Sequence, residues 1–146
     1  MYFVKKITIK ESKKCHAIDL MTIKLWNLKQ WENELRKKYV YAFACFKNYE
    51  IVGVCVFQKI FCNAELTYLS IHPTFKRKGL GEKLLKVIFK HCKGFAIEKI
   101  LLEVSEKNLA ALKFYHSFGF ETIGIRKKYY KDGSNALLQE KKLLKK

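Results

Sequence analysis

The sequence has few of the residues that separate domains and no run that could cross a membrane. Of its 146 residues only Pro73 is a proline, and no segment is rich in glycine and serine. Without a linker or an internal repeat, we expect one domain over residues 1–146, long enough for a core around one sheet. No apolar run reaches the roughly 18 residues of a membrane helix, and the apolar stretch near the start is too short for a secretory signal. We therefore expect a cytoplasmic protein with no membrane partner.

Metal-binding and disulfide patterns are also missing. The five cysteines include no C-x-x-C pair, and none of them joins the four histidines in a zinc-ligand spacing. Cys45 and Cys55 lie in apolar runs, where a free thiol behaves as a small hydrophobic residue. This usage is typical of a reduced compartment, and we expect no metal.

Acidic residues are scarce. Thirty lysines and arginines stand against 13 aspartates and glutamates, which gives a formal net charge of +17. Such an imbalance indicates an anionic partner, and nucleic acid, the ribosome, an acidic membrane or a phosphorylated small molecule would each fit. The hydrophobic share of 49% and the aromatic share of 14% exclude a disordered basic tail.

Hydrophobic periodicity predicts strands and helices in mixed order. We expect two helices within 11–38, one opening near 79 and one over 108–118, with strands over 2–9, 39–46, 50–60, 64–71, 98–104, 120–130 and 135–143. Ser105 or Asn108 is a candidate N-cap for the last helix, which Gly119 would end. Asp132-Gly133 marks a closing hairpin. Because helices and strands do not strictly alternate, we expect an α/β (α+β) fold with a mixed sheet.

A glycine-containing turn with three consecutive cationic residues lies where the helix near residue 79 begins. The turn consists of Lys76, Arg77, Lys78, Gly79, Leu80 and Gly81. Free N–H groups at a helix start make an anion site, and glycine lets the backbone approach a phosphate. No Gly-Lys-Ser/Thr follows, so this is not a Walker loop, and the third glycine of a dinucleotide fingerprint would fall at Leu84. A solvated basic turn before a surface helix fits these six residues equally well.

Several segments together resemble the GCN5-related N-acetyltransferases (GNAT). A strand ending in "LSIHP" precedes the turn, and "NLAALKFYHSFGF" and a closing hairpin follow it. The family signature, Gln/Arg-x-x-Gly-x-Gly/Ala, is matched from Lys76 to Gly81, with lysine in the first position. A lysine can meet a phosphate as a point charge but lacks the forked hydrogen-bond donors of arginine. The resemblance implies a sheet of about seven strands, splayed between the fourth and fifth and flanked by about four helices. It also implies that the turn binds the pyrophosphate of acetyl-CoA.

Residues 64–143 further resemble the bacterial RimI-type enzymes, which acetylate the N-terminal alanine of a small-subunit ribosomal protein. The resemblance depends mainly on Glu103, Tyr115 and the segment "IRKKYY". It implies two partners, acetyl-CoA and the N-terminus of a protein, in particular a ribosomal one. The basic surface could add a contact with the ribosome or its RNA.

Acetyl transfer from a thioester to an amine needs a base for the amine, a donor for the oxyanion and an acid for the departing thiolate. Glu103 ends an apolar strand, where a carboxylate is unusual. The resemblance makes it the general base, and a carboxylate that reaches solvent or a lysine is the alternative. Tyr115 carries a phenol with an ordinary pKa of about 10 that can protonate a thiolate. The resemblance makes it the general acid, and a core aromatic is the alternative.

The resemblance also assigns cofactor contacts outside the turn. Asn108 would hydrogen-bond the cofactor, with or without capping its helix. The strand would bulge and splay at Leu69, Ser70 and Ile71, leaving backbone groups free for pantetheine and the acetyl carbonyl. Taken without the family, these three residues indicate a plain core strand.

The acceptor is argued from amine basicity. At pH 7 an α-amino group, with a pKa of about 8, is about one-tenth neutral, whereas a lysine, with a pKa of about 10.4, is below about a thousandth. One modest base therefore suits a protein N-terminus, although lysine side chains and small amines stay open. Tyr129 and Tyr130 either wall a peptide slot or pack as ordinary hairpin residues. A catalytically silent RNA- or ribosome-binding module is a third reading, which the joint presence of Glu103 and Tyr115 disfavours.

Overall fold

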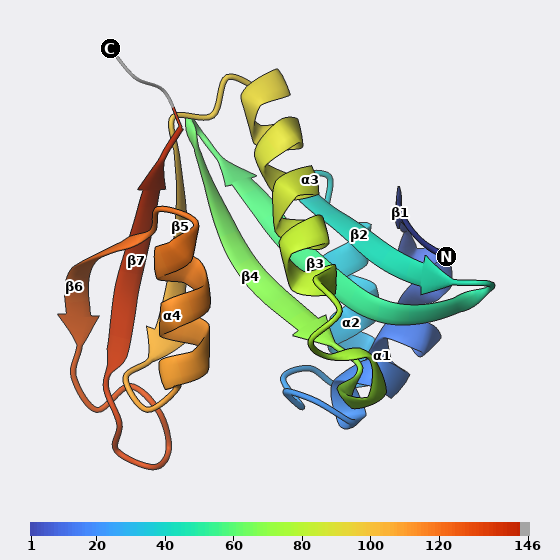
Figure 1. Ribbon diagram of the computed structural model, residues 1–146, viewed down its shortest axis with the longest axis horizontal. Coiled ribbons are helices and arrows are strands. Elements are labelled where there is room, and N and C mark those ends of the chain that lie inside the picture. The colour runs from blue at the N-terminus through green and yellow to red at the C-terminus, as the bar shows by residue number, and fades with distance from the viewer. Residues whose placement is uncertain (144–146) are drawn as a thin grey trace.

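The computed structural model describes residues 1–143, which form one seven-stranded sheet with helices on both faces (Figure 1). The strand order is β1-β2-β3-β4-β5-β7-β6, and every neighbouring pair is antiparallel except β4 and β5. The strands are β1 (Tyr2–Lys6), β2 (Val40–Lys47), β3 (Glu50–Ile60), β4 (Asn63–Ile71), β5 (Lys99–Ser105), β6 (Glu121–Arg126) and β7 (Ala136–Lys142). The mixed α/β sheet expected from the sequence is confirmed.

Four α-helices cover the sheet. They are α1 (Ser12–Leu20), α2 (Leu28–Arg36), α3 (Leu80–Gly94) and α4 (Leu109–Ser117), with short 3₁₀ turns η1 (Ile9–Glu11) and η2 (Pro73–Phe75). In Figure 1, α3 and α4 lie in front of the sheet and α1 and α2 behind it. No helix within residues 1–143 has the length and apolar character to cross a membrane.

The two layers of helices give the protein two cores. On the α3 and α4 face, Leu84, Ile88 and Ile100 belong to one buried cluster, and on the other face Trp31 and Val54 belong to a second. Strands β2 and β3 contribute to both cores with alternate residues, so they are buried on both sides. This explains their nearly continuous apolar runs, because a strand covered on one face only would alternate with polar residues.

The ends of α4 are set by local sequence, as expected. Asn108 Oδ1 accepts a hydrogen bond from Ala111 N at 3.1 Å, so Asn108 rather than Ser105 is the N-cap. Gly119 follows the helix with φ +93°, a conformation that glycine adopts at little cost.

Strands β4 and β5 meet at one end only. Three parallel pairs join them, the last being Glu65 with Leu101, and beyond these the strands diverge (Figure 1). The expected splay between the fourth and fifth strands is thus confirmed. The bulge lies at Thr67, because Val56 faces Tyr68 while the next residue of β3 faces Leu66. It therefore precedes residues 69–71, where the sequence had placed it, and those residues pair regularly with β3.

The closing hairpin is confirmed, but its strands are shorter than expected. Strand β6 ends at Arg126 and β7 begins at Ala136, so residues 127–130 belong to the connecting loop. Lys128 has φ +52°, and its N–H donates to Asn135 Oδ1 at 2.9 Å instead of to a strand. The strand assignment of residues 127–130 was wrong because this turn removes the backbone from the ladder.

A buried carboxylate joins the α1–α2 connection to the sheet. Asp19 is 0% exposed. Its Oδ1 accepts from Leu25 N and the Tyr68 hydroxyl, both at 3.1 Å, and its Oδ2 accepts from Trp26 N at 2.9 Å and Trp31 Nε1 at 3.0 Å. Four donors satisfy both oxygens, which a buried carboxylate requires. Asp19 therefore fixes the α1–α2 connection against β4.

We expect Asp19→Asn to lower the free energy of unfolding by about 3 kcal/mol, because an amide offers one acceptor oxygen and turns its own donors toward buried N–H groups. Urea denaturation measures the change. The matched control is Glu121→Gln at an exposed position, which should stay within about 0.5 kcal/mol of the parent protein. A similarly small change for Asp19→Asn would show that these hydrogen bonds do not hold the fold.

Candidate functional site

The glycine turn presents a row of unused backbone donors. The N–H groups of Gly79, Leu80, Gly81 and Glu82 donate to no acceptor among residues 1–143, and the first bond of α3 runs from Lys83 N to Gly79 O at 3.1 Å. Gly79 has φ +76° and no side chain caps the helix. The turn thus combines free donors with the positive end of the helix dipole, as an anion site requires.

The three cations of the turn are exposed and unpaired. Lys76, Arg77 and Lys78 form no ion pair with any acidic residue among residues 1–143. Arg77 has φ +62°, so the turn contains two left-handed residues in quick succession. These charges are available to an external anion.

Gly81 brings the turn close to α4. A Cβ at this position would lie 3.3 Å from Cζ of Phe114, so a larger residue would push the ring away. Phe114 in turn packs edge-on against Tyr115, with ring centroids 5.3 Å apart. The close approach therefore places the start of α3 near the Tyr115 side chain.

The diverging strands leave unpaired edges between the two halves of the sheet. Leu69, Ser70 and Ile71 pair with β3 on one side and with no strand on the other within residues 1–143. The side chain of Ser70 is buried and donates to the Tyr68 hydroxyl at 2.8 Å, which ties this edge to the Asp19 network. Backbone groups on the open edge can bind a ligand in extended conformation, as an added strand would.

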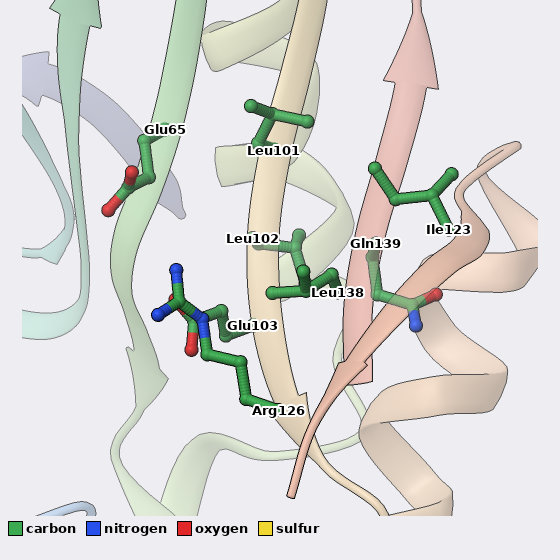
Figure 2. Close-up of a pocket in the computed structure, with 8 residues that line it drawn as sticks. All are labelled: Glu65, Leu101, Leu102, Glu103, Ile123, Arg126, Leu138 and Gln139. Atoms are coloured by element: carbon green, nitrogen blue, oxygen red, sulfur yellow. The ribbon is translucent and has the colours of Figure 1, made fainter. Parts of the chain in front are cut away.

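Glu103 lies on β5 just beyond the last pair with β4. Its side chain is 30% exposed and lines a cavity of ≈ 140 Å³ that includes Glu65 on β4 (Figure 2). Arg126 Nε is 3.5 Å from Glu103 Oε1, and Figure 2 shows the guanidinium extending across the carboxylate toward β4. The carboxylate is therefore reachable from solvent and already accepts a cation.

Tyr115 lies on the helical side of the same opening. It is 8% exposed and belongs to the core under α3 and α4. Burial, with a smaller effect of the neighbouring Cys55 thiol, raises the pKa of Tyr115 above its ordinary value. Because Cys55 is the register partner of Leu69, the phenol lies near the open edge of β4. The side chain is a protonated phenol at neutral pH.

Tyr129 and Tyr130 lie in the β6–β7 loop beside Glu103. Their rings meet at 85° with centroids 5.1 Å apart, and the Arg126 guanidinium is 5.8 Å from the Tyr129 ring centroid. Burial, and secondarily the Glu103 charge, raises the pKa of Tyr130. Both tyrosines therefore belong to a loop near Arg126 and Glu103 rather than to a strand pair.

The loop that carries these tyrosines is anchored to the β5–α4 turn. Glu106 accepts from Asn135 N at 2.6 Å and from Asn135 Nδ2 at 3.3 Å. Asp132 accepts from Ser134 N and Oγ, at 2.9 and 2.6 Å, and these bonds lower its pKa to about 2. The tyrosines are thereby held over the end of β5.

Two charged residues of the cavity, Glu65 and Arg126, were not predicted from the sequence. Glu65 is a carboxylate within an apolar strand, the same signal that singled out Glu103, whereas Arg126 is one cation among many in its segment. The Asn108 amide caps α4, so its side-chain oxygen is already engaged. Within residues 1–143, no group of three or more His, Cys, Asp or Glu side chains could hold a metal ion.

This arrangement can bind an anion, accept a proton and donate one. The turn offers free N–H donors and cations, Glu103 a carboxylate that can accept a proton, and Tyr115 a phenol that can donate one. The open strand edges lie between them, and they could align an extended ligand with its reactive end at the opening.

Comparisons with known proteins identify a family for this chain. Residues 6–120 match the acetyltransferase (GNAT) family. The ribosomal protein bS18-alanine N-acetyltransferase of Haemophilus ducreyi is 36% identical over 86 residues, 58% of this chain and 59% of that protein. Its counterpart from Escherichia coli strain K12 is 28% identical over 105 residues, 72% of this chain and 70% of that protein.

The fold agrees as well. The crystal structure of the ribosomal-protein-S18-alanine N-acetyltransferase from Escherichia coli has a TM-score of 0.93 at 22% sequence identity, and the match covers 100% of this chain and 96% of that one. The family match spans most of the chain and includes the glycine turn, Glu103 and Tyr115. The resemblance recognised in the sequence is thus confirmed, and the chain belongs to the acetyltransferase (GNAT) family, as an acetyl-CoA-dependent N-acetyltransferase similar to the RimI-type enzymes.

Proposed function

We propose that this enzyme acetylates the N-terminal α-amine of a ribosomal protein, with the N-terminal alanine of bS18 as the leading acceptor. The acceptor is the one named for the relatives in Haemophilus ducreyi and Escherichia coli. The observation that supports the proposal most is the opening between β4 and β5, with Glu103 on one side of the sheet and Tyr115 on the other.

The cofactor lies along the opening. The free N–H groups of Gly79 to Glu82 and the cations Lys76, Arg77 and Lys78 receive the pyrophosphate of acetyl-CoA. Pantetheine follows the open edge at Leu69, Ser70 and Ile71, where a backbone N–H also donates to the developing oxyanion. Asn108 holds its helix start beside the cofactor and leaves its amide donors free to contact it.

The acceptor enters from the side of Glu103. Its ammonium group takes the place beside the carboxylate that Arg126 now holds, and Tyr129 and Tyr130 wall the peptide. Glu103, directly or through a water, removes the proton from the amine, whose nitrogen then attacks the thioester carbon. The carbon–sulfur bond breaks as the tetrahedral intermediate collapses, and Tyr115 gives its proton to the departing thiolate. The nitrogen releases its second proton to solvent, and solvent returns a proton to the Tyr115 phenolate.

Loss of charge in the turn should weaken cofactor binding and leave the chemistry intact. We expect Arg77→Ala/Lys78→Ala to raise the KM for acetyl-CoA about tenfold, with kcat within about twofold, because charged groups that bind ground and transition states equally act on KM. Initial-rate kinetics measures both constants. Lys13→Ala/Lys14→Ala on α1 removes the same charge elsewhere, and an equal rise there would assign the effect to net charge.

Removal of the base or the acid should act on kcat. We expect Glu103→Gln and Tyr115→Phe each to lower kcat by about 10² to 10³, with the KM for acetyl-CoA little changed. Residual activity of Glu103→Gln should rise with pH up to about 8, where the α-amine loses its own proton. Tyr49→Phe, at a fully accessible ring, is the control for the tyrosine change. Parent-like kcat in either variant would remove that residue from the mechanism.

The pH profile tests the acid separately. Because burial raises the pKa of Tyr115 above its ordinary value of about 10, we expect the phenol to stay protonated through pH 9.5. Loss of the phenol proton should therefore not limit kcat up to that pH. A fall in kcat with an apparent pKa below 9 that vanishes in Tyr115→Phe would contradict this assignment.

The acceptor is tested by mass spectrometry of ribosomal proteins from cells with and without the enzyme. We expect one N-terminal acetyl group to be lost, and purified enzyme to acetylate a peptide with a free N-terminus but not its N-blocked form. Acetylation of the blocked peptide would mean a lysine acceptor. Turnover of small amines alone would exclude a protein acceptor.

A further inference from the structure

A second hollow lies at the opposite end of the sheet from Glu103. A groove of ≈ 610 Å³ runs between β1 and the second half of α3, with Phe43 of β2 among its lining residues. In Figure 1, β1 and β5 lie on opposite sides of α3. The proposed transfer reaction uses none of the residues that line this groove.

His91 and Phe95 offer ring surface in the groove, while Phe43 beneath them is only 4% exposed and Tyr41 packs behind Phe95. His91 lies 4.5 Å from Phe43 and 6.2 Å from Phe95, and Phe95 lies 5.2 Å from Tyr41, all measured between ring centroids. Phe95 is 36% exposed, so part of its ring is available at the rim. Stacked or tilted rings at a concave surface are the platform on which unpaired nucleobases stack.

Lysines accompany these rings without acidic partners. Lys6 Nζ is 5.4 Å from the Tyr41 ring centroid and Lys59 Nζ is 5.0 Å from that of Phe95, while Lys90 is exposed on α3. No Asp or Glu lines the groove, and none of the three lysines forms an ion pair within residues 1–143. A cation resting on an exposed ring is weakly held, so these ammonium groups are free to meet phosphates.

We propose that this groove binds a single-stranded segment of RNA, with bases on His91 and Phe95 and phosphates on Lys6 and Lys90. The net charge of +17 attracts RNA at long range, and the groove gives the RNA a defined place to bind. A membrane surface fits less well, since its binding sites are protruding apolar faces rather than a basic hollow. The choice of RNA over other polyanions rests on the proposed ribosomal acceptor.

RNA and acetyl-CoA would bind at opposite ends of the same helix. The glycine turn is at the start of α3, whose 15 residues span about 20 Å, whereas Lys90 and Phe95 lie at its end. The two ligands should therefore bind together, and RNA binding is measurable without the cofactor.

The test compares two charge-matched double variants by fluorescence anisotropy with a short labelled single-stranded RNA, across a series of salt concentrations. Lys6→Glu/Lys90→Glu changes the groove, and Lys13→Glu/Lys14→Glu makes the same charge change on exposed residues of α1, behind the sheet. Phe95→Leu removes a ring and keeps an apolar side chain. Acetylation of a free peptide, and thermal stabilisation by acetyl-CoA, check that each variant is folded.

We expect Lys6→Glu/Lys90→Glu to weaken RNA binding at least about tenfold and to reduce the slope of log K against log salt by about 1.4, or about 0.7 for each phosphate contact. Phe95→Leu should weaken binding with an unchanged slope. The α1 control should change affinity by less than about twofold.

Three outcomes would overturn the proposal. Parent-like RNA binding by Lys6→Glu/Lys90→Glu would exclude the groove as the RNA site. An equal loss of RNA affinity in the α1 control would show that only the net charge of the protein matters. If Lys6→Glu/Lys90→Glu lost binding to phosphatidylserine vesicles but kept RNA binding, the groove would be a membrane-binding surface instead. Since RNA binding is read without acetyl-CoA and peptide acetylation without RNA, failure of this proposal and failure of the proposed acceptor are told apart.

Discussion

The short parallel contact between β4 and β5 is the constraint on which the molecule depends. Three residue pairs hold these strands together, whereas β3 holds β4 and β7 holds β5 along almost their whole lengths. The sheet is therefore two antiparallel halves that share one corner. Polar backbone groups along the resulting opening need partners when they leave water, and an extended ligand between the strands, as proposed for acetyl-CoA, would provide them.

Each half of the sheet is fixed by its own polar contacts. In the first half Asp19 collects donors from the α1–α2 connection and from Tyr68, and in the second half Glu106 holds the β6–β7 loop through Asn135. Phe114 packs against Gly81 and joins the two halves on the helical face. The proposed base on β5 and the proposed acid on α4 both belong to the second half, whose β5–α4 turn is tied to the β6–β7 loop by Glu106.

Because acidic residues are scarce, the surface of the protein is strongly basic. Within residues 1–143, five lysines or arginines form an ion pair, so most cations have no carboxylate partner. Among these, the three cations of the glycine turn are exposed, and Lys6 and Lys59 rest on aromatic rings near the β1–α3 groove. Arg126 is an exception, because it meets Glu103 at the cavity where an amine would enter. A cation therefore already sits where the proposed reaction needs one, while the other positive regions remain open to anions.

The amino-acid sequence by itself determined the elements whose causes are local. The N-cap of α4 depends on Asn108 and the residue three positions on, and the glycine turn depends on adjacent residues, so both could be recognised before the fold was known. The family motifs also identified Glu103 and Tyr115 as candidate catalytic residues, but they did not predict which residues lie around them. The position of the bulge at Thr67 was missed because it depends on how two strands pair.

Tertiary structure alone decided which distant groups meet. Asp19 bonds Trp31 and Tyr68, which are 12 and 49 residues away, and Arg126 reaches Glu103 from a different strand. Periodicity shows which residues of a segment are buried, but the partner of a buried charge depends on how the layers are stacked. Local residues thus determined each helix start and turn, whereas the cavity, the groove and the network around Asp19 exist only because separate segments pack against one another.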